Sequence, residues 1–255
     1  MKTPIPNWQG VAISLRGSKH LLDDTPCQDA SRIITSVPPL SFLIVADGAG
    51  SAKHSAKGSK VAVRAASCLL FELLSFWKPA SESEWHSLLH TCALEARYAL
   101  ESLAEGEKSI RSLSTTFLIL GMDEKHVAAV HIGDCAGVVS NKQGELILLA
   151  RPYSGEYVNQ TFFLTDQDWE SNLHYNYLEE AIAFGMAFSD GLQFIALYRK
   201  APFAGFICNT ISQLREIEPR NRRSALRTYL RDNVVGKRTD DDVSLAAVWR
   251  TLGET

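Results

Sequence analysis

Residues 41–51 of this 255-residue chain read SFLIVADGAGS, an apolar run that ends in an acidic residue and a glycine-rich turn. The apolar part, Phe42 to Ala46, has the length and composition of a buried strand. Asp47 and Gly48 follow at once, and Asp-Gly is a common turn pair. The stretch therefore predicts a buried strand that brings a carboxylate to the end of a sheet.

The same pattern recurs along the chain. Residues 181–191 read AIAFGMAFSDG and residues 127–134 read VAAVHIGD, while Asp29 and Asp240–Asp242 each precede another predicted strand. Any one of these sites is more simply a turn, but five on one chain indicate that the acids form one functional site. Carboxylates gathered at one end of a sheet repel each other, and this raises their pKa values. Hard divalent cations take oxygen ligands. We therefore expect an oxygen-rich metal site, mononuclear or binuclear, of the kind that activates water and clamps a phosphoryl group.

The order of the predicted elements indicates the fold class. Strands are expected at 11–15, 31–36, 42–46, 116–121, 127–132, 136–140, 146–149, 161–164, 181–188 and 243–249. Helical spacing of apolar residues predicts long helices over 55–76 and 83–103, with Ser83 in the cap region of the second, and shorter helices over 206–217 and 222–234. Strict alternation of strand and helix would indicate a parallel sheet. This segregated order predicts antiparallel sheets with helices packed outside them, an α+β arrangement.

Composition narrows the class of protein. Hydrophobic residues make up 45% of the chain and the formal net charge is −3, which suits one globular domain over residues 1–255 and argues against affinity for nucleic acid through phosphate neutralisation. No stretch approaches the roughly 18 apolar residues of a membrane span, and Met1–Pro6 has no apolar segment of a signal peptide. Five cysteines without C-x-x-C spacing fit free thiols in a reducing cytoplasm.

Six short motifs then stand in one order over nearly the whole chain. They are GSKH (17–20) with PCQDA (26–30), VADGAG (45–50), STT (114–116), HIGD (131–134), FSDGL (188–192) and TDDDVS (239–244). In these motifs the chain resembles the metal-dependent protein phosphatases, the type-2C Ser/Thr phosphatases, in a short bacterial form. The resemblance implies a four-layer αββα sandwich, two antiparallel β-sheets flanked by helix pairs. It also implies hydrolysis of phosphoserine and phosphothreonine in proteins, with a cognate Ser/Thr kinase as the source of the substrates.

The resemblance further implies a site with two Mn²⁺ or Mg²⁺ ions. Asp47 would bridge them, the Gly48 carbonyl would be a ligand, and Asp190 and Asp241 would complete the shell of the other ion. Asp29 would ligate or support the centre, and Asp134 with Asp190 could hold a weaker third ion. A metal-bridging hydroxide would attack phosphorus directly. Within Asp240–Asp242, Asp241 is assigned because residues 242–244 align with the Asn-hydrophobe-Ser/Thr of the family, although the register could slip by one.

Several positions depart from the family pattern. Ala49 stands where many members have a histidine proposed as the general acid, and Gly133-Asp134-Cys135-Ala136 lacks the usual arginine. Gln28 replaces a frequent acid. His20, Lys19 or Arg16 would have to hold the substrate phosphate. Residues 153–177 would form a flap that faces the substrate, and its acids Asp166, Asp168 and Glu170 would either shape substrate choice or lie in a solvated loop.

Other functions remain open at this stage. A pseudophosphatase that binds phosphoproteins would have the same fold, and a small-molecule phosphohydrolase would use the same metal chemistry. A nucleotide loop at residues 48–53 is disfavoured because it matches neither the Walker motif nor G-x-G-x-x-G. The cysteines lack a C-x₅-R pattern and fit small core residues. The arginines between 220 and 231 are most simply a solvated helix face.

Overall fold

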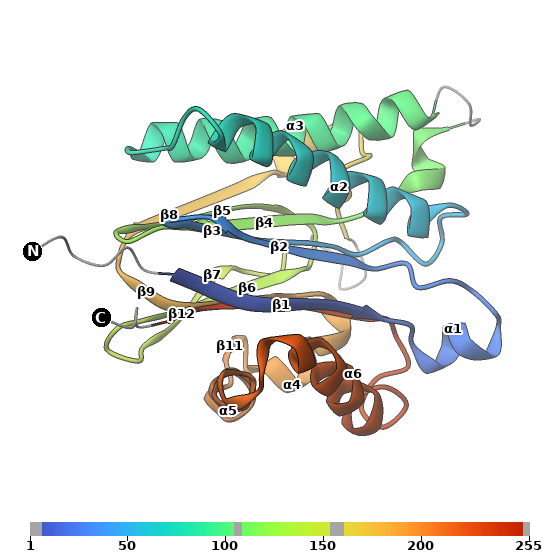
Figure 1. The fold of residues 1–255 in the computed structure, drawn as a ribbon. Helices are drawn as coiled ribbons and strands as arrows, with labels where there is room; N and C mark the ends of the chain where they lie inside the picture. The colour runs from blue at the N-terminus through green and yellow to red at the C-terminus, as the bar shows by residue number, and fades with distance from the viewer. Residues whose placement is uncertain (1–6, 105–108, 154–160, 252–255) are drawn as a thin grey trace, which may run out of the picture.

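The computed structural model describes residues 7–104, 109–153 and 161–251 and contains four layers, helix, sheet, sheet and helix (Figure 1). The upper sheet in the figure has the strand order β2 (Ala30–Val37), β3 (Leu40–Ala46), β4 (Phe117–Met122), β5 (His126–Ile132) and β8 (His174–Glu179). The lower sheet has the order β1 (Asn7–Leu15), β12 (Val243–Thr251), β9 (Ile182–Phe188), β6 (Ala136–Asn141) and β7 (Leu146–Ala150). Every neighbouring pair is antiparallel, which confirms the α+β prediction.

Helices cover the outer face of each sheet. The upper sheet carries α2 (Ser55–Leu74) and α3 (Glu82–Ala104), and the lower sheet carries α4 (Gln193–Ala196), α5 (Ala204–Glu216) and α6 (Arg222–Asn233) (Figure 1). A short helix, α1 (Ser18–Leu22), follows β1. The small hairpin of β10 (Leu197–Tyr198) and β11 (Ala201–Pro202) joins α4 to α5, and 3₁₀ turns span Ile110–Leu113, Trp169–Asn172, Asp190–Leu192 and Pro219–Asn221.

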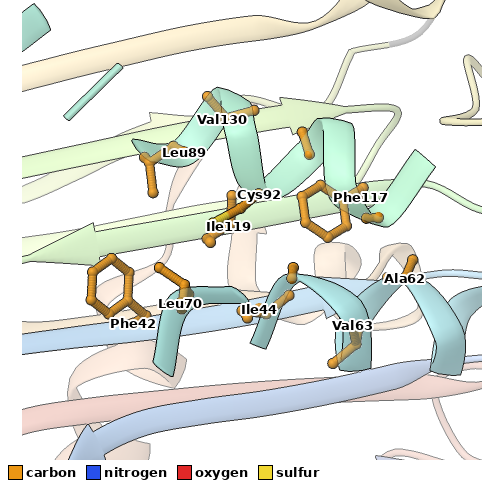
Figure 2. Close-up of a cluster of buried hydrophobic side chains, with 14 of the residues drawn as sticks. Phe42, Ile44, Ala62, Val63, Leu70, Leu89, Cys92, Phe117, Ile119 and Val130 are labelled. Carbon is orange, nitrogen blue, oxygen red and sulfur yellow. The ribbon is translucent and has the colours of Figure 1, made fainter. Parts of the chain in front are cut away.

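Strand β3 shows why this sequence builds two cores around the upper sheet. All seven of its residues are buried, because the sheet is covered on both faces and alternate side chains must enter different apolar layers. Phe42 and Ile44 pack toward α2 and α3 (Figure 2), while Leu43 and Val45 belong to the core between the sheets. Because both faces of the strand are buried, residues 42–46 are all apolar and do not alternate with polar residues.

Three local predictions were wrong. Residues 161–164 form no strand; Thr161 makes only an isolated bridge and the chain then turns. Strand β8 was not predicted, because its sequence HYNYLE lies at a sheet edge, half-buried and without apolar alternation. Helix α3 begins at Glu82, and its start is capped by Ser81 and not by Ser83: Ser81 Oγ accepts from Glu84 N at 3.4 Å while Glu84 Oε2 accepts from Ser81 N at 3.1 Å.

No helix among the described residues is long and apolar enough to cross a bilayer.

Candidate active site

The antiparallel registers bring the predicted acidic residues to one end of the sandwich. Ala30 pairs with Ala46, so Asp29, just before β2, and Asp47, just after β3, are neighbours. In the lower sheet Leu245 pairs with Phe188, so the acidic run before β12 lies beside Asp190, which follows β9. Helix α1 lies at this same end, because β1 leads into it there (Figure 1).

Asp47 is fixed through its backbone by the start of β4. The Asp47 N–H donates to Thr116 Oγ1 at 2.9 Å, and the Asp47 carbonyl accepts from Thr116 N at 2.8 Å and from Thr115 Oγ1 at 2.9 Å. Consecutive hydroxyl residues at the head of a strand thus hold the carboxylate residue on the neighbouring strand. This gives a physical role to the Ser-Thr-Thr motif at 114–116.

Three carboxyls meet in a buried cluster formed by Asp29, Asp47 and Asp190. The pKa of Asp29 is raised to about 8, mainly by burial and also by the charges of Asp242 and Asp190, while a hydrogen bond from Ser189 Oγ at 2.6 Å opposes the rise. Burial and the neighbouring charges of Asp29 and Asp190 raise the pKa of Asp47 well above its usual range. Burial raises the pKa of Asp190 to about 6. The cluster is unfavourable as three free anions and needs protons or a cation.

The donor chemistry of the cluster suits a hard divalent cation. All its side-chain donors are carboxylate oxygens, the ligands that Mg²⁺ and Mn²⁺ prefer. In the described residues no group of three or more Asp, Glu, His or Cys side chains is arranged around a possible ion. Asp47 contacts both Asp190 and Asp29 through its side chain. The donor chemistry of the three carboxyls therefore fits a hard divalent cation.

Gly48 brings its backbone close to this cluster. A Cβ added there would lie 2.7 Å from the Gln28 carbonyl oxygen and 2.9 Å from Ser55 Cβ, so any side chain would force the loop apart. Gly48 also forms an isolated bridge with Thr115. Gly48 lines the smaller cavity together with Asp47, and the resemblance implies that its carbonyl is a backbone ligand there.

Asp134 and Asp241 complete the acidic wall. Both line the two cavities that open at this end, together with Asp190. Thr161 Oγ1 donates to Asp134 Oδ2 at 3.0 Å, and Gln193 Nε2 donates to the Asp134 carbonyl at 2.6 Å. Burial raises the pKa of Asp134. The supporting roles of Thr161 and Gln193 were not predicted, because their only common feature is proximity in the fold.

Asp241 and Asp242 face different surroundings. Asp242 is 2% exposed, and its carboxylate accepts from the backbone N–H groups of Gly17 and Gln28, both at 2.6 Å. His20 Nδ1 lies 3.0 Å from Asp242 Oδ1. Asp241 is exposed to the cavities. Of the two residues, Asp241 lines the cavities, while the carboxylate of Asp242 is engaged by backbone donors.

The three candidates for phosphate binding are placed differently. Lys19 and His20 line a cavity of about 520 Å³ together with Asp47 and Gly48. Arg16 instead donates to the carboxylate of Asp24 at 3.4 Å and to the carbonyl of Thr25 at 3.2 Å. The structure therefore brings Lys19 and His20 to the acidic cluster and engages Arg16 with the loop that follows α1.

The predicted flap, residues 153–177, lies partly outside the described residues, which omit 154–160. Within the described part, Asp166 closes its own turn by accepting from Phe163 N at 2.8 Å. Its backbone carbonyl accepts from Arg97 at 2.8 Å. Asp168 and Glu170 flank the start of the 3₁₀ turn at Trp169–Asn172. Neither cavity is lined by these three acids; Tyr153, Thr161, His174 and Tyr175 from the same segment do line the larger one.

Comparison with known proteins gives consistent results. A family model described as Protein phosphatase 2C matches residues 16–231. Serine/threonine-protein phosphatase 3 of Escherichia coli (strain K12) is 32% identical over 256 residues, covering 95% of this chain and 99% of that protein. Among solved structures, the catalytic domain of the serine/threonine protein phosphatase PstP in complex with two manganese ions has a TM-score of 0.65 at 19% identity, covering 96% of this chain and 99% of that one. PppA of Pseudomonas aeruginosa has a TM-score of 0.65 at 15% identity, covering 97% and 99%. The two structural likenesses show the shared fold.

Proposed function

The chain belongs to the protein phosphatase 2C family, and from this membership we propose that it is a metal-dependent phosphatase that hydrolyses phosphoserine and phosphothreonine in proteins. The observation that carries the proposal is the cluster of Asp29, Asp47 and Asp190, whose burial and mutual repulsion are relieved by a divalent cation. The matched structure of PstP contains two manganese ions, which supports Mn²⁺ as one suitable metal. Mg²⁺ has the same ligand preferences and stays an alternative.

The residues of the cluster would hold the metal. Asp47, Asp190 and Asp241 with the Gly48 carbonyl are the proposed ligands, Asp29 ligates or supports them, and Asp134 with Asp190 could take a further ion. When bound, divalent ions lower the pKa of bound water and stabilise charge on phosphoryl oxygens. Thr115 and Thr116 keep Asp47 in place through its backbone, and Ser189 orients Asp29.

Lys19 and His20 are proposed to hold the substrate phosphate. Both line the cavity that contains Asp47, and α1 is anchored there because Lys19 N donates to the Asp240 carbonyl at 3.1 Å and Gly17 N donates to Asp242. A cation beside the acidic wall would attract the phosphate that the carboxylates alone would repel. Water would protonate the leaving oxygen, because Ala49 supplies no acid.

Predictions about domain extent, substrates and location follow from the same proposal. The catalytic unit would be one domain over residues 1–255, its substrates would be the targets of a Ser/Thr kinase, and a cytoplasmic location stays a prediction. The Escherichia coli relative and PstP are both described as phosphatases, and neither description supports the alternative of a regulatory pseudophosphatase.

Phosphate release tests the proposal. We expect release from p-nitrophenyl phosphate and from a phosphothreonine peptide in Mn²⁺ or Mg²⁺, abolished by EDTA. Asp190→Ala should lower the rate by on the order of a hundredfold or more, because it removes a ligand. Asp168→Asn, which changes an acid outside both cavities, is the matched control and should keep the wild-type rate. Folded wild-type protein that releases no phosphate with either metal would contradict the proposal.

A further inference from the structure

The larger cavity extends well beyond the acidic cluster. It has a volume of about 1010 Å³ and shares Asp134, Asp190 and Asp241 with the smaller cavity at its inner end. Pockets that enclose a whole drug-sized ligand measure roughly 300–1,000 Å³. One phosphorylated side chain would fill only part of this space. The remainder can accept the residues on either side of it.

Two cations stand on one wall of this cavity. Arg151 follows directly after β7, and Lys200 lies at the tip of the β10–β11 hairpin, whose second strand contacts β7. Both side chains belong to exposed residues. Among the residues that the structure describes, no carboxylate lies within ion-pair distance of either one. Within the described residues, which omit 154–160, both charges thus face the cavity without a carboxylate partner.

The backbone that carries Arg151 is held firmly. His131 is 3% exposed, and its Nε2–H donates to the Arg151 carbonyl at 2.9 Å. Two residues further on, Tyr153 N donates to the Gly133 carbonyl at 3.0 Å, and the Tyr153 ring lies 4.3 Å from that of His174. Arg151 thus projects from a fixed rim.

Lys200 is held in a conformation that its residue type disfavours. The turn residues of the hairpin, Arg199 and Lys200, have φ values of 50° and 64°, the left-handed region that bulky L-residues avoid. Two-residue hairpin turns of this kind favour Asn-Gly. Arg199 lies over the Tyr198 ring at 5.3 Å, whereas Lys200 lines the cavity. The left-handed turn thus places Lys200, and not Arg199, on the cavity wall.

From this arrangement, and resting on the proposed function, we infer that Arg151 and Lys200 select substrates in which an acidic side chain lies close to the phosphorylated residue. The phosphate would occupy the inner end beside Asp190 and Asp241. A flanking Asp or Glu would then reach the rim cations, while a flanking Lys or Arg would be repelled. The chemical class of the substrate is an acidic phosphopeptide segment.

Binding of labelled peptides tests the inference without requiring turnover. Fluorescence anisotropy would compare peptides that carry a non-hydrolysable phosphonate in place of phosphoserine, flanked on both sides by Glu, Gln or Lys. In Mn²⁺ at low ionic strength we expect the Glu peptide to bind wild type about threefold to tenfold more tightly than the Gln peptide, the size that exposed ion pairs supply. Added salt should shrink this ratio. The Lys peptide should bind most weakly.

The variant Arg151→Gln/Lys200→Asn should bring the ratio to about one. Asn suits the left-handed turn position, so the double variant should melt no lower than wild type. Arg199→Gln is the matched control, since it removes a charge from the same turn outside the cavity, and it should keep the wild-type ratio. Equal binding of the Glu and Gln peptides to wild type, or an unchanged ratio in the double variant, would overturn the inference. Hydrolysis of p-nitrophenyl phosphate, which has no flanking residues, reports separately on the proposed function.

Discussion

Adjacent residues Asp241 and Asp242 have opposite surroundings, and this contrast allows a test at the level of single side chains. Asp241→Asn should lower kcat/KM by about 10- to 100-fold at limiting metal, as loss of metal-site residues does. Its stability should hardly change, since the Asn Oδ1 can still accept from Asp242 N as the carboxylate does at 2.8 Å. Activity titrated with Mn²⁺ and urea unfolding measure the two effects.

Asp242→Asn should behave in the opposite way. Both oxygens of Asp242 accept backbone N–H groups, so an amide nitrogen at either position would oppose a donor in a buried site. We expect a loss of about 1–3 kcal/mol in the free energy of unfolding. A large loss of stability in the Asp241 variant, with little in the Asp242 variant, would show that the register is shifted by one.

His131 gives the fold a dependence on pH that can be assigned to one side chain. The pKa of His131 is lowered to about 4, mainly by burial and also by the charge of His174, while the hydrogen bond to the Arg151 carbonyl opposes the shift. An unfolded histidine titrates near 6.5. Between these values the unfolded chain binds more protons, so stability should fall as pH drops from about 6.5 to about 4, by up to about 3 kcal/mol.

His131→Gln isolates this contribution, because Gln keeps a donor for the Arg151 carbonyl but does not titrate. Urea unfolding in EDTA at a series of pH values would give the stability difference between wild type and variant. We expect the advantage of wild type to shrink steadily below pH 6.5. A difference that stays constant with pH would show that His131 does not titrate in this way.

At the scale of elements, the start of α3 shows how local chemistry fixes a helix boundary. Ser81 and Glu84 exchange bonds across the first turn, and Glu84 Oε2 also accepts from Ala80 N at 2.8 Å. Ser81→Ala should therefore destabilise the protein by about 1 kcal/mol, the usual effect of removing a cap. Ser83→Ala removes a hydroxyl that bonds only Ser81 Oγ, at 3.2 Å, and should change much less. Thermal melting of both variants decides between the two serines.

The burial pattern of each helix and strand explains which of them could be predicted from the sequence. The helices α2 and α3 were predicted because a buried helix face repeats apolar residues at helical spacing, and β3 was predicted because a strand buried on both faces is a short continuous apolar run. Strand β8 leaves no such period, since an edge strand with half-buried polar and aromatic residues depends on its partner β5 for pairing. Residues 161–164 have an apolar composition but turn, because Asp166 accepts from Phe163 N in a local turn and Thr161 donates to Asp134, which is distant in sequence.

At the scale of the whole molecule, binding of the metal at the site should raise the stability of the folded protein. A ligand that binds only the folded state, at a concentration a hundredfold above its Kd, raises the free energy of unfolding by about 3 kcal/mol. For a chain of this size that corresponds to roughly 5–10 °C in Tm. We expect Mn²⁺ to produce such a shift in wild type and EDTA to reverse it. Asp190→Asn, which removes one proposed ligand charge, should show a much smaller shift, and an equal shift in both proteins would contradict the proposed site.

The sequence by itself determined the α+β arrangement, because burial marks the local sequence of the long helices and of most strands, and it determined which acids follow the strands. The tertiary structure alone decided which of them share a site. Asp241 faces the cavities and Asp242 does not, because backbone donors of Gly17 and Gln28, far away in sequence, capture the latter. Lys19 and His20 line the smaller cavity, whereas Arg16 does not, because the Thr25 carbonyl accepts from its guanidinium. Arg151 and Lys200 become neighbours only through contact between β7 and the β10–β11 hairpin. Such pairings depend on contacts between distant segments, which no local pattern records.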